Sequence, residues 1–257
     1  MKTFGCIGCG NMGSAILGGL ESQQDISLIG YDPSGNVPCT ACDTNLELAE
    51  QADFIMLAVK PDYVESVLET IQPALTEDKV IISIAAGVSM ETLSKHSGGK
   101  CPVIRCMPNT PAMVGEGIFA FCFDDPALTE TQQTAVHTMF EQIGQVMVLP
   151  ESKFNAFTAI AGCGPAYVLY FMEAVTEAAV SVGFNRKEAT EMAINLFKGT
   201  TKLADESDHH LSLLREMVCS PAGVTIAAVN HMDRTALRGN IIDSIFKARD
   251  RGIEMSK

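Results

Sequence analysis

The sequence is short of positive charge. Its 18 Lys and Arg residues are outnumbered by 31 Asp and Glu residues, which gives a formal net charge of −13 at pH 7. Nucleic acids and anionic membrane surfaces are usually bound by basic protein surfaces, so we expect neither as a partner. Any anionic ligand must therefore be held by a local group of donors rather than by the overall charge.

Long apolar runs and a secretory signal are also lacking. No stretch approaches the roughly 18 apolar residues of a membrane span, so no membrane-spanning helix is predicted. The segment from Lys2 to Leu20 resembles a signal peptide only superficially, because glycines and Asn11 interrupt it and no small-x-small cleavage site follows. We expect a cytoplasmic protein.

A disulfide framework is missing too. The chain has nine cysteines, an odd number, and several lie inside apolar stretches such as 103–106 and 121–123. This usage is typical of small buried thiols in a reducing compartment.

The first 150 residues alternate between strand-like and helix-like patterns. The chain has 257 residues, 47% of them hydrophobic, so it can bury the core of one domain or of two. Amphipathic segments such as 11–20 and 128–143 predict helices. Strands are expected at 4–8, 26–31, 54–59, 80–84, 103–107, 118–123 and 146–149. The alternation predicts an α/β fold, a Rossmann-type doubly wound and mostly parallel sheet over residues 1–150.

No strand-like run follows Pro150. Pro165 occupies a first helical position, and apolar residues then recur at helical spacing until Gly183. Further helices are expected at 186–203, 221–230 and 234–252. Residues 151–257 are therefore predicted to form an all-helical domain. Its helices are more apolar than a small bundle requires, so we expect it to be buried in a homodimer or a larger homo-oligomer.

The stretch Gly8-Cys9-Gly10-Asn11-Met12-Gly13 fits the pattern G-x-G-x-x-G. It lies between a predicted strand and a predicted helix, and Asp32 ends the next strand roughly 20 residues later. Such glycines allow a tight turn, close approach of a pyrophosphate, and close packing of helix on strand. Free amides at the helix N-terminus then receive the phosphates, so the context predicts a dinucleotide site.

A zinc site is the competing interpretation of the same residues. Cys6 and Cys9 form one C-x-x-C spacing, and Cys39 and Cys42 form another. Zinc would require Cys6 and Cys9 to point the same way, whereas Cys6 lies inside a predicted strand and Cys9 lies in the glycine turn. No His near either pair completes a ligand set, so we expect no metal.

Small residues and prolines follow three further predicted strands. They occupy positions 58–61, 85–88 and 105–111. Each stretch alone is explained equally well by ordinary turn chemistry. Ligands of open α/β sheets bind beyond the carboxyl ends of the strands, so the three together indicate room for an extended ligand.

These motifs resemble those of the pyrroline-5-carboxylate reductase family along essentially the whole chain. The matching stretches are 7–13, 58–61, 85–88, 105–111, 162–167 and, most specifically, 218–225 continuing to 232–233. The resemblance implies hydride transfer from NADPH or NADH to the C=N bond of 1-pyrroline-5-carboxylate, giving L-proline in the last step of proline biosynthesis. It also implies that the helical domains of two chains interlock, with the active site where one chain's cofactor domain meets the dimer interface.

The resemblance assigns residues as well. It implies that the substrate meets Glu151, Ser220, Val224 and Thr225, with Thr225 as the catalytic candidate. The expected cofactor-binding set combines the positions implied by the resemblance with Asp32 and the loops after the strands. It consists of Ile7, Gly8, Cys9, Gly10, Asn11, Met12, Asp32, Ser34, Asn36, Asn45, Ala58, Val59, Lys60, Ala86, Met107, Pro108 and Asn109.

The chemistry of the reaction agrees with this set. A protonated cyclic imine is already electrophilic, so the site must supply orientation and a seat for the substrate carboxylate rather than a strong acid. Ser220 and Pro221 are predicted as the N-cap and first residue of a helix, whose following amides can receive an anion. Ser220 could equally be a cap with no other role. The hydroxyl of Thr225 is expected to bond the substrate nitrogen or its carboxylate.

Two alternatives stay open. A β-hydroxyacid-dehydrogenase-type oxidoreductase would need a base, and that family places a lysine on the first long helix of its second domain. Here no Lys or Arg occurs between Lys153 and Arg186. A non-enzymatic NAD(P)-binding sensor is the other alternative, which turnover of pyrroline-5-carboxylate would exclude.

The choice between NADP(H) and NAD(H) also stays open. No Lys or Arg lies between Lys2 and Lys60 to hold a 2′-phosphate, and Asp32 suits the free ribose hydroxyls of NAD. Neutral Ser34 and Asn36 could nevertheless bind that phosphate through hydrogen bonds.

Overall fold

The computed structural model describes residues 1–255 of the chain, which divide into two compact units. Unit 1 comprises Met1–Cys163 together with the residues from Ala248 onward, and unit 2 comprises Gly164–Lys247. These units are defined by contacts. The functional domains expected at 1–150 and 151–257 remain a prediction.

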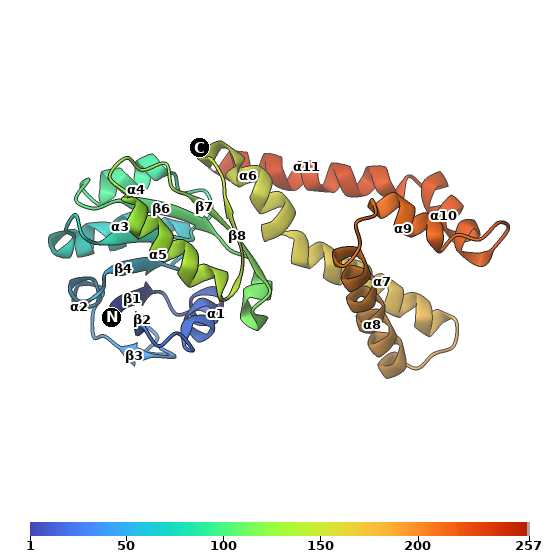
Figure 1. Ribbon diagram of the computed structural model, residues 1–257, viewed down its shortest axis with the longest axis horizontal. Coiled ribbons are helices and arrows are strands. Elements are labelled where there is room, and N and C mark those ends of the chain that lie inside the picture. The colour runs from blue at the N-terminus through green and yellow to red at the C-terminus, as the bar shows by residue number, and fades with distance from the viewer. Residues whose placement is uncertain (256–257) are drawn as a thin grey trace. The chain divides into compact units, whose positions relative to one another are not determined.

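Unit 1 contains an eight-stranded sheet in the order β3-β2-β1-β4-β5-β6-β7-β8 (Figure 1). The strands are β1 Lys2–Ile7, β2 Ile26–Tyr31, β3 Thr40–Ala41, β4 Phe54–Leu57, β5 Val80–Ser83, β6 Val103–Met107, β7 Gly117–Cys122 and β8 Gly144–Val148. All neighbouring strands are parallel except β6 and β7. The order of the first six is that of dinucleotide-binding folds, so the predicted fold class is confirmed.

Both faces of the sheet are covered by helices, which explains the apolar strands. Phe4 and Cys6 of β1 point to a core cluster with α1 Asn11–Leu20 and α5 Glu130–Glu141. Ile7 points to the opposite cluster with α2 Asn45–Gln51, α3 Pro61–Ile71 and α4 Met90–His96. The alternation along each strand therefore fixes which helices lie on which side.

A helical run follows β8 without a strand. It comprises a 3₁₀ turn Glu151–Lys153, α6 Phe154–Phe157, a π turn Thr158–Gly162, and then α7 Gly164–Ser181. Within the stretch Glu151–Ser181, a window of 18 residues has a mean hydropathy of 1.2, which by length and composition alone is enough to cross a membrane. The expectation that no stretch approaches this limit is therefore wrong. Only 6% of this window is buried within the chain, so its side chains are free to pack against another protein.

Unit 2 is entirely helical, as predicted. It contains α7, α8 Arg186–Asp205, α9 Leu211–Met217, α10 Val224–Arg234 and the first part of α11 Leu237–Met255. Helix α9 was not expected, and α10 begins three positions after Pro221, the expected start.

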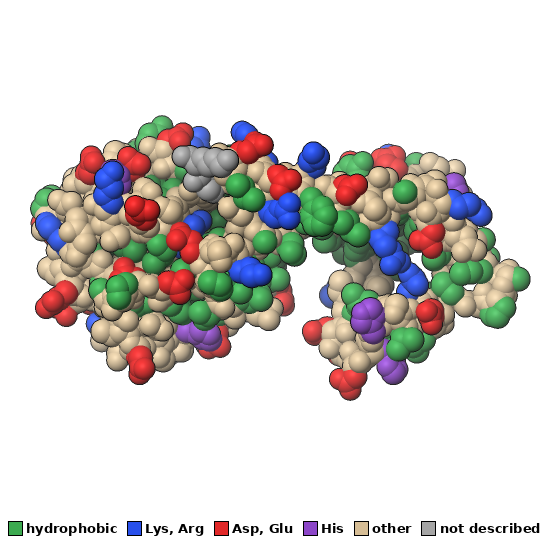
Figure 2. All heavy atoms as spheres, turned by 90° about the horizontal axis from the view of Figure 1, so that it is seen from above, with side chains coloured by type: hydrophobic (Ala, Val, Ile, Leu, Met, Phe, Trp, Pro, Cys, Tyr) green, Lys and Arg blue, Asp and Glu red, His purple; other side chains and the backbone are tan. Residues whose placement is uncertain are grey.

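Unit 2 has almost no core of its own. Among its described residues only Thr176, Ala189 and Ala193 are buried. Large apolar side chains are open to solvent instead, among them Leu169 at 63% and Tyr170 at 73% exposure, and Figure 2 shows hydrophobic side chains on the surface of these helices. Exposed apolar surface on this scale marks a protein interface, which agrees with the predicted homo-oligomer.

We expect the stability of the protein to rise with its concentration, because the helices of unit 2 complete their core only against a second copy. The melting temperature should increase across a dilution series, and sedimentation should show little folded monomer. Leu169→Asp should weaken the assembly, although the side chain is 63% exposed in the single chain. A monodisperse, stably folded monomer would contradict this expectation.

Candidate active site

The glycine turn lies at the point where the strand order reverses. Strand β1 pairs with β2 on one side and with β4 on the other. The amide of Gly8 donates to the carbonyl oxygen of Tyr31 at 2.8 Å, and the amide of Ala58 donates to that of Ile7 at 2.8 Å. Open α/β sheets bind ligands at this place, beyond the carboxyl ends of the strands.

The glycines of the turn differ in what requires them. Gly8 has φ of +96°, and a Cβ there would lie 2.7 Å from the carbonyl oxygen of Ala58. A Cβ on Gly13 would collide with the carbonyl oxygen of Gly8. Gly10 has φ of −68°, and an added Cβ would have no atom within 4 Å. The protein itself requires glycine at 8 and 13, whereas no other part of the protein requires it at 10.

Asp32 is held beside this turn by hydrogen bonds on both carboxylate oxygens. Its Oδ2 accepts from the Cys9 amide at 2.8 Å, and its Oδ1 accepts from the Ser34 amide at 2.9 Å and the Ser34 hydroxyl at 2.6 Å. The Ser34 hydroxyl bond, with those from the two amides, holds the pKa of Asp32 below its usual value. The carboxylate is therefore ionised and fixed in position.

A cavity of about 770 Å³ opens at the N-terminus of α1. Six of its lining residues were expected in the cofactor set: Cys9, Gly10, Asn11, Asp32, Ser34 and Asn36. The others are Ser14, Ala15, Gly18, Gly19, Ala112, Met113 and Gly115. The last three come from the 3₁₀ helix Thr110–Val114 and its cap, which no local sequence pattern places opposite α1. The small residues Ser14, Ala15, Gly18 and Gly19 recur at helical spacing in α1, and this pattern indicates a helix face that leaves room for a cavity.

The remaining expected cofactor residues lie outside the lining of this cavity. Lys60 is exposed at the N-cap of α3, and Ala86 is half-buried in the loop after β5. Ile7, Met107 and Pro108 are buried, and Ala58 and Val59 are half-buried. Asn45 begins α2, and its Oδ1 is buried without a partner among the described residues. Ile7 and Met107 are the last residues of β1 and β6, and the other positions follow strands at the same edge of the sheet or, for Asn45, follow the short strand β3.

Asn109 uses its side chain inside unit 1. Its Nδ2 donates to the carbonyl oxygen of Ala161 at 3.1 Å, and its Oδ1 accepts from the amide of Ile118 at 2.9 Å. The side chain thereby ties the end of β6 to β7 and to the π turn.

The thiols of Cys6 and Cys9 do point to the same side, which corrects the expectation that the strand would separate them. Both belong to the cluster of α1, and the hydrogen bond between them raises the pKa of Cys6 and lowers that of Cys9. Burial raises the pKa of the neighbouring Cys39 to about 11. Within residues 1–255, no group of three or more His, Cys, Asp or Glu side chains is arranged for a metal ion.

Glu151 forms an ion pair that the sequence did not indicate. Its Oε1 accepts from Nη1 of Arg105 at 2.7 Å and from the amide of Met90, the first residue of α4, at 2.7 Å. The guanidinium lies 4.8 Å from the centroid of the Phe154 ring, and the Arg105 side chain is 9% exposed. Glu151 therefore ties β6 to the start of α4, and it makes no hydrogen bond through Oε2 within the described residues.

Ser220 does not cap α10, so that expectation is wrong. The amide of Gly223 donates to the carbonyl oxygen of Ser220 at 3.0 Å, and Ala222 has φ of +55°. Proline at the second position and positive φ at the third are typical of a type II turn, which closes before the helix begins. Gly223 is the N-cap and has no side-chain bond. The free amides of α10 therefore start at Val224 and not at Pro221.

The expected substrate residues are divided between the two units. Glu151 belongs to unit 1, whereas Ser220, Val224 and Thr225 belong to unit 2. Val224 is 90% exposed and Thr225 is half-buried in the first turn of α10. A meeting of these residues around one substrate remains a prediction.

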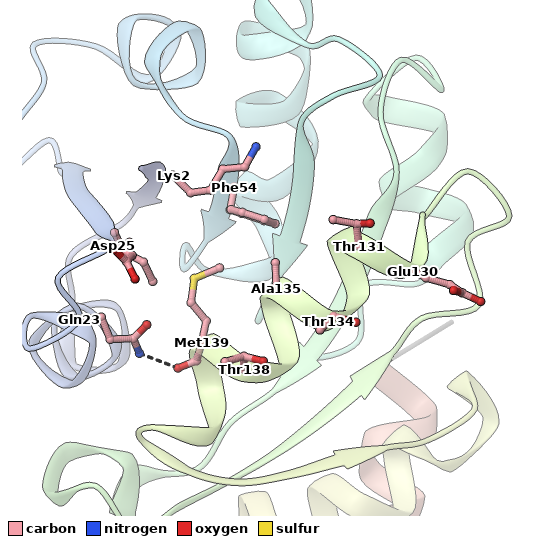
Figure 3. Close-up of a pocket in the computed structure, with 11 residues that line it drawn as sticks. Lys2, Gln23, Asp25, Phe54, Glu130, Thr131, Thr134, Ala135, Thr138 and Met139 are labelled. Atoms are coloured by element: carbon pink, nitrogen blue, oxygen red, sulfur yellow. Dashed lines mark hydrogen bonds between the residues drawn. The ribbon is translucent and has the colours of Figure 1, made fainter.

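A second hollow, of about 630 Å³, lies at the amino end of β1 (Figure 3). Lys2, Gln23 and Phe54 line it together with residues of α5, and Gln23 donates to the carbonyl oxygen of Met139 at 2.9 Å. It lies at the edge opposite the glycine turn, so it is not part of the cofactor site.

Comparisons with known proteins match the whole chain to pyrroline-5-carboxylate reductases. Residues 151–255 match the family model described as pyrroline-5-carboxylate reductase dimerisation, and residues 3–87 match that described as NADP oxidoreductase, coenzyme F420-dependent. The pyrroline-5-carboxylate reductase of Escherichia coli is 35% identical over 100% of this chain and 99% of its own. The pyrroline-5-carboxylate reductase of Methanosarcina acetivorans is 31% identical over 100% of this chain and 98% of its own. The crystal structure of Plasmodium falciparum pyrroline carboxylate reductase with NADP bound superposes with a TM-score of 0.93 at 31% identity. The match covers 100% of this chain and 98% of that one.

Proposed function

Because this chain belongs to the pyrroline-5-carboxylate reductase family, we propose that its cofactor set and its substrate set serve one hydride transfer. The protein is an NAD(P)-dependent oxidoreductase that reduces the C=N bond of 1-pyrroline-5-carboxylate to give L-proline. The observation that carries this conclusion is similarity over the full length of both chains, combined with a glycine turn that is open at Gly10.

The dinucleotide is held by unit 1 in this proposal. The open space at Gly10 and the first amides of α1 receive the pyrophosphate, since a helix N-terminus favours an anion. The carboxylate of Asp32 faces the adenosine ribose, and Ala86 and Met107 lie toward the nicotinamide end. The bound nicotinamide supplies the hydride.

The substrate is oriented by three features of the chain. The free amides that begin at Val224 receive its carboxylate, because the turn at Ser220 ends where α10 begins. The hydroxyl of Thr225 donates to the ring nitrogen or to the carboxylate. Glu151, whose Oε1 is paired with Arg105, offers its Oε2 as a hydrogen-bond acceptor to the protonated imine.

The assembly and location complete the proposal. Residues 1–150 bind the dinucleotide, and residues 151–257 form the dimerisation and substrate-binding domain. The active site lies where the cofactor domain of one chain meets the dimer interface. We place the protein in the cytoplasm, because all nine cysteines are free thiols.

Steady-state turnover tests the function directly. Purified protein should oxidise NADH or NADPH only when 1-pyrroline-5-carboxylate is added, with L-proline as the product. A β-hydroxyacid with oxidised cofactor is the matched control. Turnover of the β-hydroxyacid would support the dehydrogenase alternative, and dinucleotide binding without any turnover would support a sensor.

Replacing Thr225 by Val is expected to lower kcat/KM for pyrroline-5-carboxylate by ~1–3 kcal/mol, roughly five- to 150-fold, with cofactor affinity nearly unchanged. The substitution keeps the shape and removes the donor. Kinetics and the melting temperature should be measured on the same preparation.

Two variants control this experiment. Thr225→Ser keeps the hydroxyl and should retain most of the activity. Thr235→Val removes a hydroxyl bonded to the His231 carbonyl beyond the other end of the same helix, and it should leave kcat/KM unchanged. Wild-type kinetics in Thr225→Val would remove Thr225 from the site.

A further inference from the structure

We propose that this enzyme prefers NADH to NADPH and that Asp32 sets the preference, an inference that rests on the function proposed above. The comparisons name NADP, since residues 3–87 match a family model described as an NADP oxidoreductase and the similar Plasmodium falciparum structure has NADP bound. In this chain, three observations at the end of β2 nevertheless favour NADH.

The first observation is the fixed orientation of the Asp32 carboxylate. An acidic residue at this place in a dinucleotide fold accepts a hydrogen bond from the ribose 2′-hydroxyl. A carboxylate has about four acceptor positions. Here Cys9 occupies one on Oδ2, and the amide and hydroxyl of Ser34 occupy two on Oδ1. The position left on Oδ2 matches the single donor that a ribose hydroxyl offers.

The second observation is the absence of a cation to balance a 2′-phosphate. No Lys or Arg is among the residues that line the 770 Å³ cavity, and none occurs in the sequence between Lys2 and Lys60. Lys2 lies at the amino end of β1, at the edge of the sheet opposite the cavity. A phosphate monoester carries a charge of about −1.5 to −2 at neutral pH. It would lie beside the negatively charged Asp32 with no positive side chain to offset the repulsion.

The third observation concerns the neutral donors that could replace a cation. Both donors of Ser34 already point at Asp32, at 2.9 Å from its amide and 2.6 Å from its hydroxyl. The hydroxyl of Ser14 is likewise engaged, donating to the carbonyl oxygen of Cys9 at 2.7 Å. A 2′-phosphate bound by Ser34 or Ser14 would have to break these bonds, whereas a ribose hydroxyl leaves them in place.

The wild-type enzyme provides the primary test. We expect kcat/KM for NADH to exceed that for NADPH at least tenfold at saturating 1-pyrroline-5-carboxylate. Equal efficiency, or a preference for NADPH, overturns the proposal while leaving the reductase function intact. If neither cofactor supports reduction, the proposed function fails, and the dissociation constants of NADH and NADPH from titration still decide the preference.

Variants then test the role of Asp32. Asp32→Asn keeps the shape and removes the charge, so the efficiency ratio of NADPH to NADH should rise at least tenfold. Adding Asn36→Arg supplies a cation at the cavity and should reverse the preference. Asp25→Asn is the matched control. It removes the same charge from the residue that immediately precedes β2, whereas Asp32 immediately follows this strand, so it should leave the ratio unchanged. An unaltered ratio in a folded Asp32→Asn protein removes Asp32 as the determinant.

Discussion

Replacing Gly10 by Val is expected to abolish dinucleotide binding while the protein still folds cooperatively. The backbone there has φ of −68° and ψ of −167°, which any residue adopts, and an added Cβ meets no protein atom within 4 Å. A valine would instead fill the space where the pyrophosphate approaches. Hydrogen bonds to charged groups contribute about 1.5–3 kcal/mol each, so losing two weakens affinity by roughly 100-fold or more.

Titration with NADH and NADPH, alongside thermal unfolding, checks this expectation. Gly8→Val is the contrasting variant, because its φ of +96° and the 2.7 Å approach to Ala58 make any side chain destabilising. Gly8→Val should therefore lose stability and binding together, and Gly10→Val should lose binding alone. Unchanged affinity in Gly10→Val would remove the glycine turn from the cofactor site.

Glu151→Ala is expected to lower the free energy of unfolding by about 1.5–3 kcal/mol, the usual contribution of a hydrogen bond to a charged group, because only the Arg105 side of the ion pair is buried. Arg105, with 9% of its side chain exposed, would keep its charge without a carboxylate at 2.7 Å. The amide of Met90 would lose its acceptor as well. Denaturant unfolding at one fixed protein concentration measures the difference.

Three further variants measure how much of this loss comes from the ion pair. Glu151→Gln keeps an acceptor for Arg105 and Met90, so its loss of stability should be smaller. Arg105→Met should destabilise less than Glu151→Ala, because it leaves the partly exposed carboxylate unpaired rather than the guanidinium. The double variant Arg105→Met with Glu151→Leu should recover much of the stability. Wild-type stability in Glu151→Ala would show that the pair contributes nothing to the fold.

The main strands and long helices of the fold were predictable because their periodicity is local. Strands β2 and β6 and helix α1 lie where the pattern predicted them. Strand β3 was missed because a pairing of two residues at the edge of a sheet leaves no periodic signal. The start of α10 was misplaced because Pro221 fits both a first helical residue and the second residue of a turn, and the positive φ of Ala222 decides for the turn.

The candidate site was predictable where its residues are near in sequence or obey a known spacing. The glycine turn and Asp32 meet this condition, and the structure joins them through the Cys9 amide. The pair of Arg105 and Glu151 does not, because the choice of partner across 46 positions is made by tertiary packing. A charged residue inside the apolar strand β6 was the only trace of it in the sequence.

The hollow at the amino end of β1 has a consequence for inhibitor discovery. The six residues of β1 place it roughly 17 Å from the glycine turn, at about 3.3 Å per residue. A fragment that binds the native hollow would raise the melting temperature by mass action. It would not compete with the dinucleotide, however, so a screen that ranks compounds by thermal shift alone would select ligands that leave turnover untouched.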